Sequence, residues 1–329
     1  MYNAAITAVG GYVPPFILDN EKLSLKFDVT KEYIYDTTGI NQRHIWKEHK
    51  LGVAHLASKS VLSMLSGYDI DVNSIDVIIF CTSTPDSNLP SAASRLCSLI
   101  GSRAWCFDLN AACSGFLYGL SLASSMIRGG SFKKVLVVGA DIMTSCIDPD
   151  NKNTSMVFGD GGGCVVLEPS QDYGIIDTFL GSSENSGEEH LNIKSGGSAI
   201  PISSENLANK EHFIYMNGST VFKNAVKYIT YSIEHILQKN QLNIEDINWF
   251  IVHQANKRIL DKVAGNLNLP NNKILVNIDR YGNTSNATIP LLFNDFSHLF
   301  KNNDKIIVSA FGAGFTWGSV YLKWCSKIV

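Results

Sequence analysis

The sequence predicts an α/β protein assembled from a duplicated unit, and three observations support this fold class. The chain has 329 residues, of which 45% are hydrophobic and 17% charged, so it can bury a large core. Apolar runs with the character of strands alternate with helical patterns along most of the chain. Several of these runs recur at a nearly constant spacing, which predicts that one folding unit occurs twice.

The recurring segments form two pairs. "SIDVIIFCTST" begins at Ser74, and "DINWFIVHQAN" begins 172 residues later, at Asp246. "KVLVVGA" begins at Lys134 and "KIIVSAF" begins 171 residues later, at Lys305. These runs are rich in Val and Ile and lack regular polar alternation, a pattern typical of strands buried on both faces. We therefore expect sheets that are covered by helices.

The two halves also end alike, since "FGDGGGCVVLE" begins at Phe158 and "FGAGFTWGSVYLK" begins at Phe311. We expect an N-terminal half over residues 1–170 and a C-terminal half over residues 171–329. Residues 171–215 are rich in Ser, Gly, Asn and Glu, a composition that predicts an elaborated loop between the halves.

Bulk properties exclude several classes of function. The formal net charge of −3 argues against a general binder of nucleic acid or of anionic membranes. No stretch approaches the roughly 18 apolar residues that span a bilayer, and the N-terminus lacks the basic leader of a secretory signal. The seven cysteines, an odd number without a CxxC pair, disfavour a disulfide framework and a zinc site. We expect a cytoplasmic protein that holds no metal and binds neither nucleic acid nor membrane.

The stretch from Ala104 to Gly130 predicts a strand followed by a buried helix. Ala104–Leu109 is typical of a strand, apolar residues recur at helical spacing after Cys113, and two glycines end the helix. The other helix face carries Ser and Gly rather than charges before Arg128, which predicts burial on all sides. Cys113 then lies at a helix N-terminus, where unpaired amides and the helix dipole favour a reactive thiolate. We expect five other cysteines to pack in the core: Cys81, Cys97, Cys106, Cys146 and Cys164.

A histidine and an asparagine stand in comparable positions. His253 follows a predicted strand that ends at Val252, and Asn283 lies in a Gly-containing loop before another helix. Ligands of open α/β sheets gather beyond the carboxyl ends of strands, so the two halves can bring these side chains to Cys113. The three residue types predict acyl transfer: a cysteine attacks an activated acyl group while the other two donate hydrogen bonds to an oxygen that becomes negative.

These residues resemble the active-site motifs of the β-ketoacyl-acyl-carrier-protein synthase III family, which belongs to the thiolase-like condensing enzymes. Cys113 lies in AACSGF, His253 in HQAN and Asn283 in GNTSNATIP. The similarity extends along nearly the whole chain, because TTGINQRHI, PSAASRL, FGDGGGCVVLE, MNGSTVFKNAV and FGAGFTWGS all occur in the expected order.

The resemblance implies a thiolase-like, five-layered αβαβα fold built from two duplicated halves, and a homodimer. It implies that Cys113 takes an acyl group from acyl-CoA, and that malonyl-acyl-carrier protein then loses CO2 and condenses with this group, in fatty acid or related specialised biosynthesis. His253 and Asn283 would stabilise the enolate, a charge that exists only late in the reaction. The backbone amides of Cys113 and Ala313 would form the oxyanion hole. The substrates would be thioesters of CoA and of a phosphopantetheine carrier, with no tightly bound cofactor.

Other positions match the substrate tunnel and the acyl pocket of the family, namely Gly218, Phe222, Phe311 and Leu89. Leu89 matches a position that reaches across the dimer to close the acyl pocket. Larger aromatic residues are familiar at this position, so the leucine predicts room for a longer or branched acyl primer.

The expected CoA entrance departs from the family pattern. Tyr33 and Thr37 stand where the family often has a tryptophan and an arginine that sandwich the adenine of CoA. Tyrosine stacks with less area than tryptophan, and threonine offers no flat cationic face. The acyl donor can therefore be acyl-CoA or an acyl-carrier protein.

A basic rim is expected at the tunnel mouth because carrier proteins are acidic. Arg258 matches a carrier-docking position of the family, and Lys257 and Lys262 lie on the same predicted helix. Charges in such a rim act mainly on the rate of encounter and on its salt dependence.

Three other functions fit parts of the pattern. An acyltransferase of the same fold would pass the acyl group to an amine or an alcohol. A non-catalytic partner of a condensing enzyme would usually lack the nucleophile, whereas all three residue types are present here. Papain-like cysteine hydrolases also use Cys, His and Asn in this chain order, but the local sequence around their nucleophile is missing.

Overall fold

The computed structural model describes residues 2–184 and 187–325, and a nine-stranded sheet forms its centre. The strand order is β11-β12-β13-β8-β1-β7-β6-β4-β5. The contact between β8 and β1 is formed by a single residue pair, Ala4 with Ile175, so two halves of the sheet meet there. The strands of the first half are β1 (Asn3–Tyr12), β4 (Val77–Cys81), β5 (Trp105–Leu109), β6 (Val135–Ile142) and β7 (Asp160–Ser170). Those of the second half are β8 (Gly174–Ser182), β11 (Trp249–Val252), β12 (Lys305–Gly312) and β13 (Thr316–Lys323).

The two halves of the sheet repeat one pattern of strand pairing. In the first half, β4 pairs parallel with β6, and β6, β7 and β1 then pair antiparallel in turn. In the second half, β11 pairs parallel with β12, and β12, β13 and β8 pair antiparallel in the same way. The recurring sequences lie in β4 and β11 and in β6 and β12, so the predicted duplicated α/β fold is confirmed. The domain boundary at residue 170 stays a prediction.

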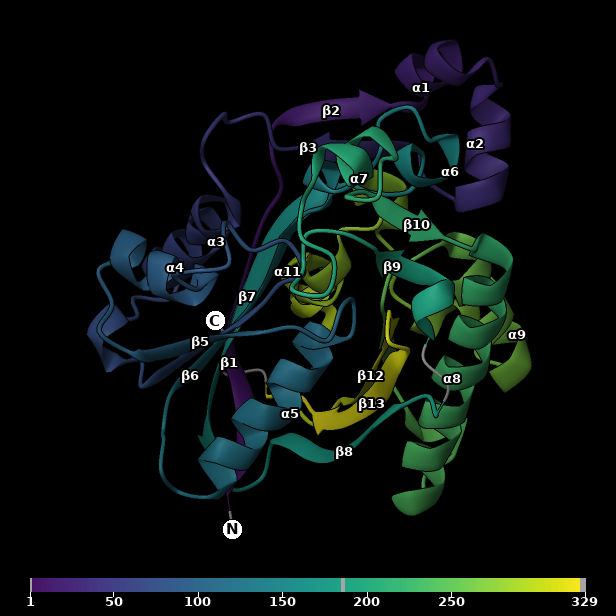
Figure 1. Cartoon of the computed structure of the whole chain (residues 1–329). Coiled ribbons are helices and arrows are strands. Elements are labelled where there is room, and N and C mark those ends of the chain that lie inside the picture. The colour runs from purple at the N-terminus through teal and green to yellow at the C-terminus, as the bar shows by residue number, and fades with distance from the viewer. Residues whose placement is uncertain (1, 185–186, 326–329) are drawn as a thin grey trace.

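Helices form three layers around the two halves of the sheet, as Figure 1 shows. On the outer face of the first half lie α3 (Val53–Gly67) and α4 (Ala92–Ile100), and on that of the second half lie α8 (Gly218–Lys239) and α9 (Lys257–Leu267). Between the halves lie α5 (Gly115–Arg128) and α11 (Thr288–Phe296), which contact strands of both. The order is helix, sheet, helix, sheet, helix, which matches the five layers expected from the resemblance.

The central helices are apolar because they are enclosed between the two halves of the sheet. Along α5, Phe116, Leu117 and Leu120 are fully buried, and Ser125 is the one exposed residue of the helix. The prediction of a helix buried on all sides is therefore confirmed. Glycine is required at one of its contacts, since a Cβ on Gly119 would lie 2.7 Å from the sulfur of Cys81 on β4. Small residues allow this helix to pack closely against the sheet.

The segment 171–215 contains more regular structure than a loop. Its first part forms β8, which pairs with β13 along most of its length, so the loop prediction is wrong there. The apolar run "GIIDTFLG" supplies this strand, and the Ser- and Gly-rich composition of the later residues concealed it. The rest holds β9 (Leu191–Ile193), α7 (Ser204–Ala208) and β10 (Ile214–Met216), and β9 and β10 pair with each other.

Short elements complete the described part of the chain. They are β2 (Phe16–Asp19), α1 (Asn20–Phe27), α2 (Lys31–Thr38), β3 (Gln42–Ile45), α6 (Lys152–Ser155) and α10 (Ile278–Tyr281). Among them, β2, β3, α1, α2 and α6 lie in the upper region of Figure 1. No helix within residues 2–184 and 187–325 is long and apolar enough to cross a bilayer.

Candidate active site

A cavity of about 810 Å³ opens where the two halves of the molecule meet. Its lining includes Cys113 from the first half and His253, Asn283 and Ala313 from the second. These side chains are far apart in the sequence, and three of them follow the carboxyl ends of strands: Cys113 follows β5, His253 follows β11 and Ala313 follows β12. The cavity therefore gathers every residue that the sequence places in the catalytic group and the oxyanion hole.

Cys113 lies just before α5, two residues ahead of Gly115, at the predicted helix N-terminus. The Ser285 hydroxyl donates a hydrogen bond to its Sγ at 3.5 Å. The expected lowering of the thiol pKa is wrong: burial raises the pKa of Cys113 to about 11, and the carboxylate of Asp141 adds to this effect. Loss of water around the thiolate thus outweighs the helix dipole and the Ser285 hydrogen bond. At neutral pH the resting site holds a thiol.

His253 follows directly after β11, as predicted, and its side chain is almost fully buried. Its backbone N–H donates to the Ser309 carbonyl on β12 at 2.8 Å, which continues the parallel pairing of the strands. Its Nδ1 lies 2.6 Å from the hydroxyl oxygen of Thr288, at the start of α11. Burial lowers the pKa of His253 to about 4, so the imidazole is uncharged at neutral pH.

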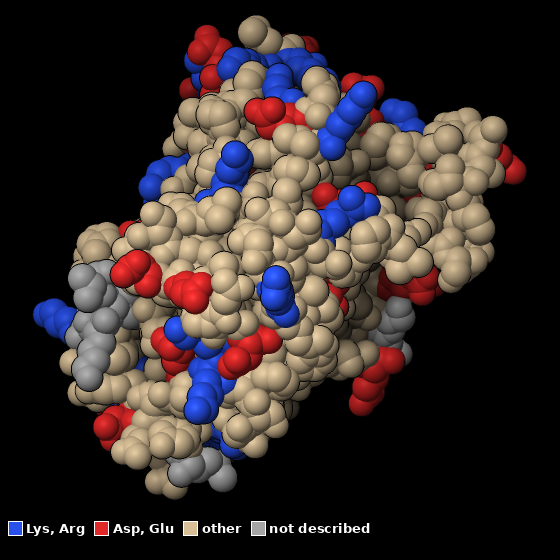
Figure 2. Space-filling model, turned by 90° about the vertical axis from the view of Figure 1, so that its left-hand side faces the viewer, with Lys and Arg blue, Asp and Glu red and all other residues tan. Residues whose placement is uncertain are grey.

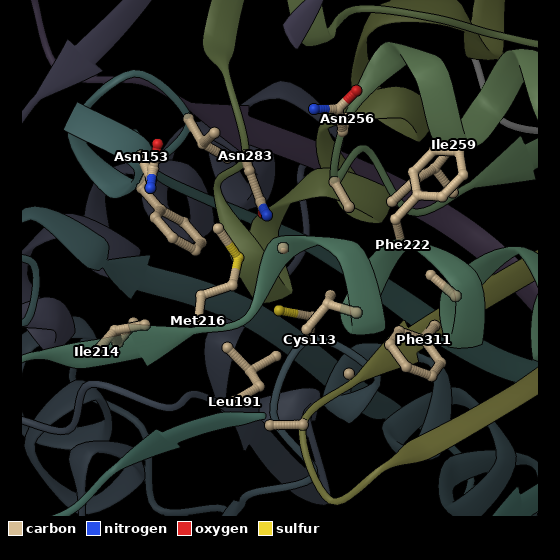
Figure 3. Close-up of a pocket in the computed structure, with 18 of the residues that line it drawn as sticks. Cys113, Asn153, Leu191, Ile214, Met216, Phe222, Asn256, Ile259, Asn283 and Phe311 are labelled. Atoms are coloured by element: carbon tan, nitrogen blue, oxygen red, sulfur yellow. The ribbon is translucent and has the colours of Figure 1, made fainter. Parts of the chain in front are cut away.

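Asn283 is oriented by its own loop. Its backbone pairs with the segment between α6 and β7, because its N–H donates to the Val157 carbonyl at 2.9 Å and its carbonyl accepts from the Gly159 N–H at 3.1 Å. Its side-chain oxygen accepts a hydrogen bond from the Ser285 N–H at 2.9 Å. The side-chain nitrogen is thereby left to point into the cavity, toward the Cys113 sulfur, as Figure 3 shows. The amide is thus held as a hydrogen-bond donor to a ligand.

Glycine at position 312 brings the second half against the backbone of the cysteine. A Cβ on Gly312 would lie 2.8 Å from the backbone nitrogen of Cys113 and 3.0 Å from that of Ser114. Any side chain would therefore push β12 away from the nucleophile. Ala313, the next residue, lines the cavity beside Cys113. The backbone amides expected to form an oxyanion hole come from these two adjoining segments.

A buried carboxylate joins the two halves beneath the cavity, a feature that sequence reasoning missed. Asp141 has no exposed surface and accepts hydrogen bonds from Thr82, Ser83 and Thr84. It also accepts from the backbone and side-chain nitrogens of Asn286, at 3.0 and 2.8 Å.

Asn286 extends this link to the nucleophile, because its side-chain oxygen accepts from the Phe116 N–H in the first turn of α5 at 3.1 Å. The only signal in the sequence is the polar Asn286 inside "GNTSNATIP". Its distant partner Asp141, 145 residues away, gives no pattern that marks it.

The predicted tunnel and pocket residues separate into two groups. Gly218, Phe222 and Phe311 line the cavity, whereas Leu89 does not line it and is 86% exposed. The role of Leu89 in a neighbouring subunit stays a prediction. The walls are formed largely by apolar side chains, and Figure 3 labels three of them, Leu191, Ile214 and Met216. Sequence reasoning identified neither these three nor Met143, Met156 and Ile193, which also line the cavity.

Tyr33 and Thr37 both line the cavity, and their place at a CoA entrance stays a prediction. The Thr37 hydroxyl donates to the Tyr33 carbonyl at 2.7 Å, within its own helix α2. The ammonium group of Lys152, on α6, lies 5.3 Å from the centre of the Tyr33 ring. A cation thus stands beside the aromatic ring even though Thr37 cannot supply one.

Only one of the three predicted docking cations lines the cavity. Arg258 does so, with its guanidinium 5.9 Å from the centre of the Phe222 ring. Lys257 forms an ion pair with Asp261 one helical turn away, and Lys262 is exposed on the same helix. Among the described residues, no group of three or more His, Cys, Asp or Glu side chains is placed to hold a metal ion.

Two parts of the chain match one protein family. Residues 107–184 match the family described as 3-oxoacyl-[acyl-carrier-protein] synthase III, and residues 237–324 match its C-terminal region. The first match contains Cys113, and the second contains His253, Asn283 and Ala313.

Similar proteins cover nearly the full length of the chain. A β-ketoacyl-[acyl-carrier-protein] synthase III of Bacteroides thetaiotaomicron is 44% identical over 98% of this chain and 96% of its own. That of Porphyromonas gingivalis is 41% identical over the same shares. Among solved structures, 3-oxoacyl-(acyl carrier protein) synthase III of Pseudomonas aeruginosa is 32% identical, with a TM-score of 0.89 over 98% of both chains. That of Thermus thermophilus is 33% identical, with a TM-score of 0.90 over 98% of this chain and 99% of its own.

Proposed function

Because this chain belongs to the 3-oxoacyl-[acyl-carrier-protein] synthase III family, we propose that its cavity carries out that family's condensation with Cys113, His253 and Asn283 as the reacting side chains. The protein is a condensing acyltransferase of the β-ketoacyl-acyl-carrier-protein synthase III type. The observation that carries the assignment of residues is their meeting in one cavity from both halves of the molecule.

In the first stage an acyl thioester enters the cavity and Cys113 attacks its carbonyl carbon. A new bond forms between Sγ and this carbon, the bond to the donor sulfur breaks, and the thiol proton leaves with the donor sulfur. The backbone amides of Cys113 and Ala313 face the oxygen that becomes negative and stabilise it. The thiol pKa of about 11 supports a nucleophile that loses its proton as the substrate arrives rather than a resting thiolate.

In the second stage the malonyl group of malonyl-acyl-carrier protein loses its carboxylate as CO2. The electrons of the broken C–C bond form an enolate, whose oxygen accepts hydrogen bonds from His253 and Asn283. Its carbon then attacks the acyl group, the bond to Sγ breaks, and the thiolate takes up a proton from solvent. The uncharged His253 and the fixed amide of Asn283 support this role, because both donate without requiring a charged site.

The acyl donor is a thioester of CoA or of a carrier protein. The exposed Tyr33 ring with Lys152 beside it offers an aromatic face and a positive charge, features that suit a nucleotide with phosphates. Arg258 at the same mouth suits an acidic carrier. The apolar walls of the cavity suit a hydrocarbon chain as the acyl group.

We also propose that two copies of the chain associate through the open edge of β5. This strand ends the sheet, and its Trp105 is 54% exposed although it stacks on Phe132. Leu89 and Leu99 are further exposed apolar residues next to and within α4. Figure 2 shows the side of the molecule on which α3, α4 and β5 lie, and much of this face carries no charged side chain.

Light scattering after size exclusion tests this association. Trp105→Arg is expected to convert a dimer to a monomer, whereas Tyr215→Arg, at an equally exposed residue on β10, is expected to leave the dimer intact. Equal masses for Trp105→Arg and the parent protein would contradict an interface at β5.

Intact-protein mass spectrometry tests the reaction itself. The protein is incubated with a series of acyl-CoA and acyl-carrier thioesters, and a mass gain equal to the acyl group is expected. Cys113→Ala should abolish this gain, and Cys97→Ala, at a buried cysteine on α4, should retain it. Addition of malonyl-acyl-carrier protein should then release a β-ketoacyl product together with CO2. Transfer of the acyl group without loss of CO2 would instead favour simple acyl transfer, and no loading of Cys113 by any donor would refute the assignment.

A further inference from the structure

We propose that Arg43 is a positioning residue, which fixes the segment that binds the backbone of Asn283 and so keeps the Asn283 amide directed at the reacting group. The inference rests on the proposed function, because it concerns the hydrogen bond from Asn283 to the enolate oxygen. Arg43 has no exposed surface and does not line the cavity. It can therefore act on the reaction only through the residues that it holds.

The guanidinium of Arg43, on β3, binds the carbonyl at the end of α6. Its Nε donates to the Met156 carbonyl at 3.2 Å, and its Nη2 donates to the same oxygen. Its Nη1 donates to the side-chain oxygen of Asn20 at 2.7 Å, and the nitrogen of that side chain donates to the Ile40 carbonyl. Burial lowers the pKa of Arg43 to about 10, so the group is charged at neutral pH and keeps all its donors. Because the donors of a planar guanidinium have fixed directions, they determine where the Met156 carbonyl lies.

The residues that follow Met156 hold the backbone of Asn283. The Asn283 N–H donates to the carbonyl of Val157, and the Asn283 carbonyl accepts from the N–H of Gly159. Between these two partners, Phe158 pairs with Asn283 as an isolated parallel bridge. The Met156 carbonyl belongs to the peptide group that precedes Val157, so a shift of this group would move both hydrogen-bond partners and Asn283 with them.

The aliphatic stem of Arg43 packs against both segments of this pairing. A Cβ on Gly159 would lie 3.2 Å from Cβ of Arg43, and a Cβ on Gly282 would lie 3.1 Å from its Cγ. Gly159 follows the bridge on one segment, and Gly282 directly precedes Asn283 on the other. One buried side chain thus supports the pairing from below and holds one of its segments by hydrogen bonds.

The consequence for the reaction is confined to one stage. Asn283 donates to the enolate oxygen in the second stage, and Figure 3 shows its side-chain nitrogen pointing toward the Cys113 sulfur. Acyl loading depends instead on Cys113 and on the backbone amides of Cys113 and Ala313. Loss of the guanidinium should therefore slow the decarboxylating stage and spare the loading of Cys113.

Three variants test this role. Arg43→Met keeps an unbranched side chain and removes every donor, whereas Arg43→Lys keeps the charge but replaces the fork by a single ammonium group. Arg128→Met is the matched control, because Arg128 also donates to two backbone carbonyls, those of Ile175 and Ile176, and lies at the end of α5 that is remote from Cys113. Thermal unfolding checks that each variant folds. Should Arg43→Met fail to fold, Arg43→Lys serves for the same measurements.

Kinetics of the two stages give the first measurement. Arg43→Met should lower the rate of condensation by about 10- to 100-fold, with acyl loading of Cys113 within about twofold of the parent. Arg43→Lys should show a smaller loss of the same kind, and Arg128→Met should match the parent in both stages. Equal losses of loading and condensation in the Arg43 variants would show a general structural role and overturn the inference.

A double-mutant cycle gives the second measurement. If Arg43 acts through Asn283, Arg43→Met should lower the remaining condensation rate of Asn283→Ala by less than about twofold. A further loss as large as in the parent would show that Arg43 acts independently of Asn283, which also overturns the inference. Failure of the parent protein to load Cys113 would instead overturn the proposed function, so the two failures are distinguishable.

Discussion

The two halves of the molecule have the same strand pairing and use its loops differently. In the first half, β4 is followed by Thr82, Ser83 and Thr84, which donate hydrogen bonds to the buried Asp141. In the second half, β11 is followed by His253, which lines the cavity. A loop position that binds a structural carboxylate in one half thus holds a reacting side chain in the other.

The loops before the two central helices, in contrast, serve the same purpose in both halves, because both of them face the cavity. Cys113 precedes α5, and Asn283 precedes α11 at a distance of 170 residues. Duplication therefore supplied two equivalent loops at one end of the molecule, and divergence gave one a nucleophile and the other a hydrogen-bond donor. The difference teaches that the repeated fold determines where a site can form, whereas the individual side chains determine its chemistry.

Replacement of the reacting side chains of the second half tests this division with the largest expected effect. His253→Ala and Asn283→Ala should each lower condensation by about 10²- to 10⁴-fold, because each removes a donor to the enolate oxygen. Acyl loading should persist in both, since it depends on Cys113 and on backbone amides rather than on these two side chains. Mass spectrometry measures loading, and release of CO2 from malonyl-acyl-carrier protein measures the second stage. Loss of loading in both variants would show that the halves do not divide the two stages.

The pH dependence of stability sharpens the comparison, because burial shifts the pKa of Asp160 in the first half and of His253 in the second in opposite directions. The pKa of His253 is lowered from 6.5 to about 4 by burial, so its contribution to stability is present above pH 6.5 and is lost as the pH falls toward 4. The pKa of Asp160 is raised from 3.8 to about 6 by burial, so its contribution is present below pH 3.8 and is lost as the pH rises through 6.

Urea unfolding between pH 4 and 7 measures the two contributions. Each corresponds to about 3 kcal/mol over its pH range. Relative to the parent protein, His253→Gln should lose less stability on acidification, and Asp160→Asn should lose more. Parallel pH curves for His253→Gln and the parent would contradict a buried, uncharged histidine.

A smaller effect is expected where the halves are joined by Asn286. Asn286→Ala removes one donor to Asp141 and the acceptor of the Phe116 N–H, so it should lower the free energy of unfolding by about 2–3 kcal/mol. Asn224→Ala on α8 is the control, because that side chain bonds only a carbonyl of its own helix. Chemical denaturation measures both. Equal stability of the two variants would mean that the link between the halves is not structural.

The smallest effects are expected at the mouth, where both halves contribute cations. Lys152→Glu in the first half should raise KM for acyl-CoA, and Arg258→Glu in the second should raise KM for malonyl-acyl-carrier protein, each by about 5- to 10-fold at low salt. Lys262→Glu, exposed on the same helix as Arg258, should change neither. Equal changes in both KM values for each variant would show that the mouth does not separate the two substrates.

Much of the fold was predictable because it rests on local patterns. The recurring Val- and Ile-rich runs indicated β4, β6, β11 and β12, and the small-residue face after Cys113 indicated the central helix. The strand β8 was missed, since only four of its nine residues, Ile175, Ile176, Phe179 and Leu180, are large and apolar. The side chains of the candidate site were found from motifs, whereas most of the apolar wall was not, because a lone Met or Ile has no distinguishing pattern.

The sequence by itself determined the alternation of strands and helices, the duplication, and the identity of Cys113, His253 and Asn283, because each depends on residues that are near one another in the chain. Only the tertiary structure decided the pKa values of the cysteine and the histidine and the hydrogen-bond partners of these side chains. The thiol pKa rises rather than falls because the halves close over Cys113 and exclude water. The contact of Asn286 with Asp141 exists because loops of both halves converge, and that of His253 with Thr288 exists because two distant segments of the second half meet at the same place. Burial and partners across long separations depend on that convergence, which no local pattern specifies.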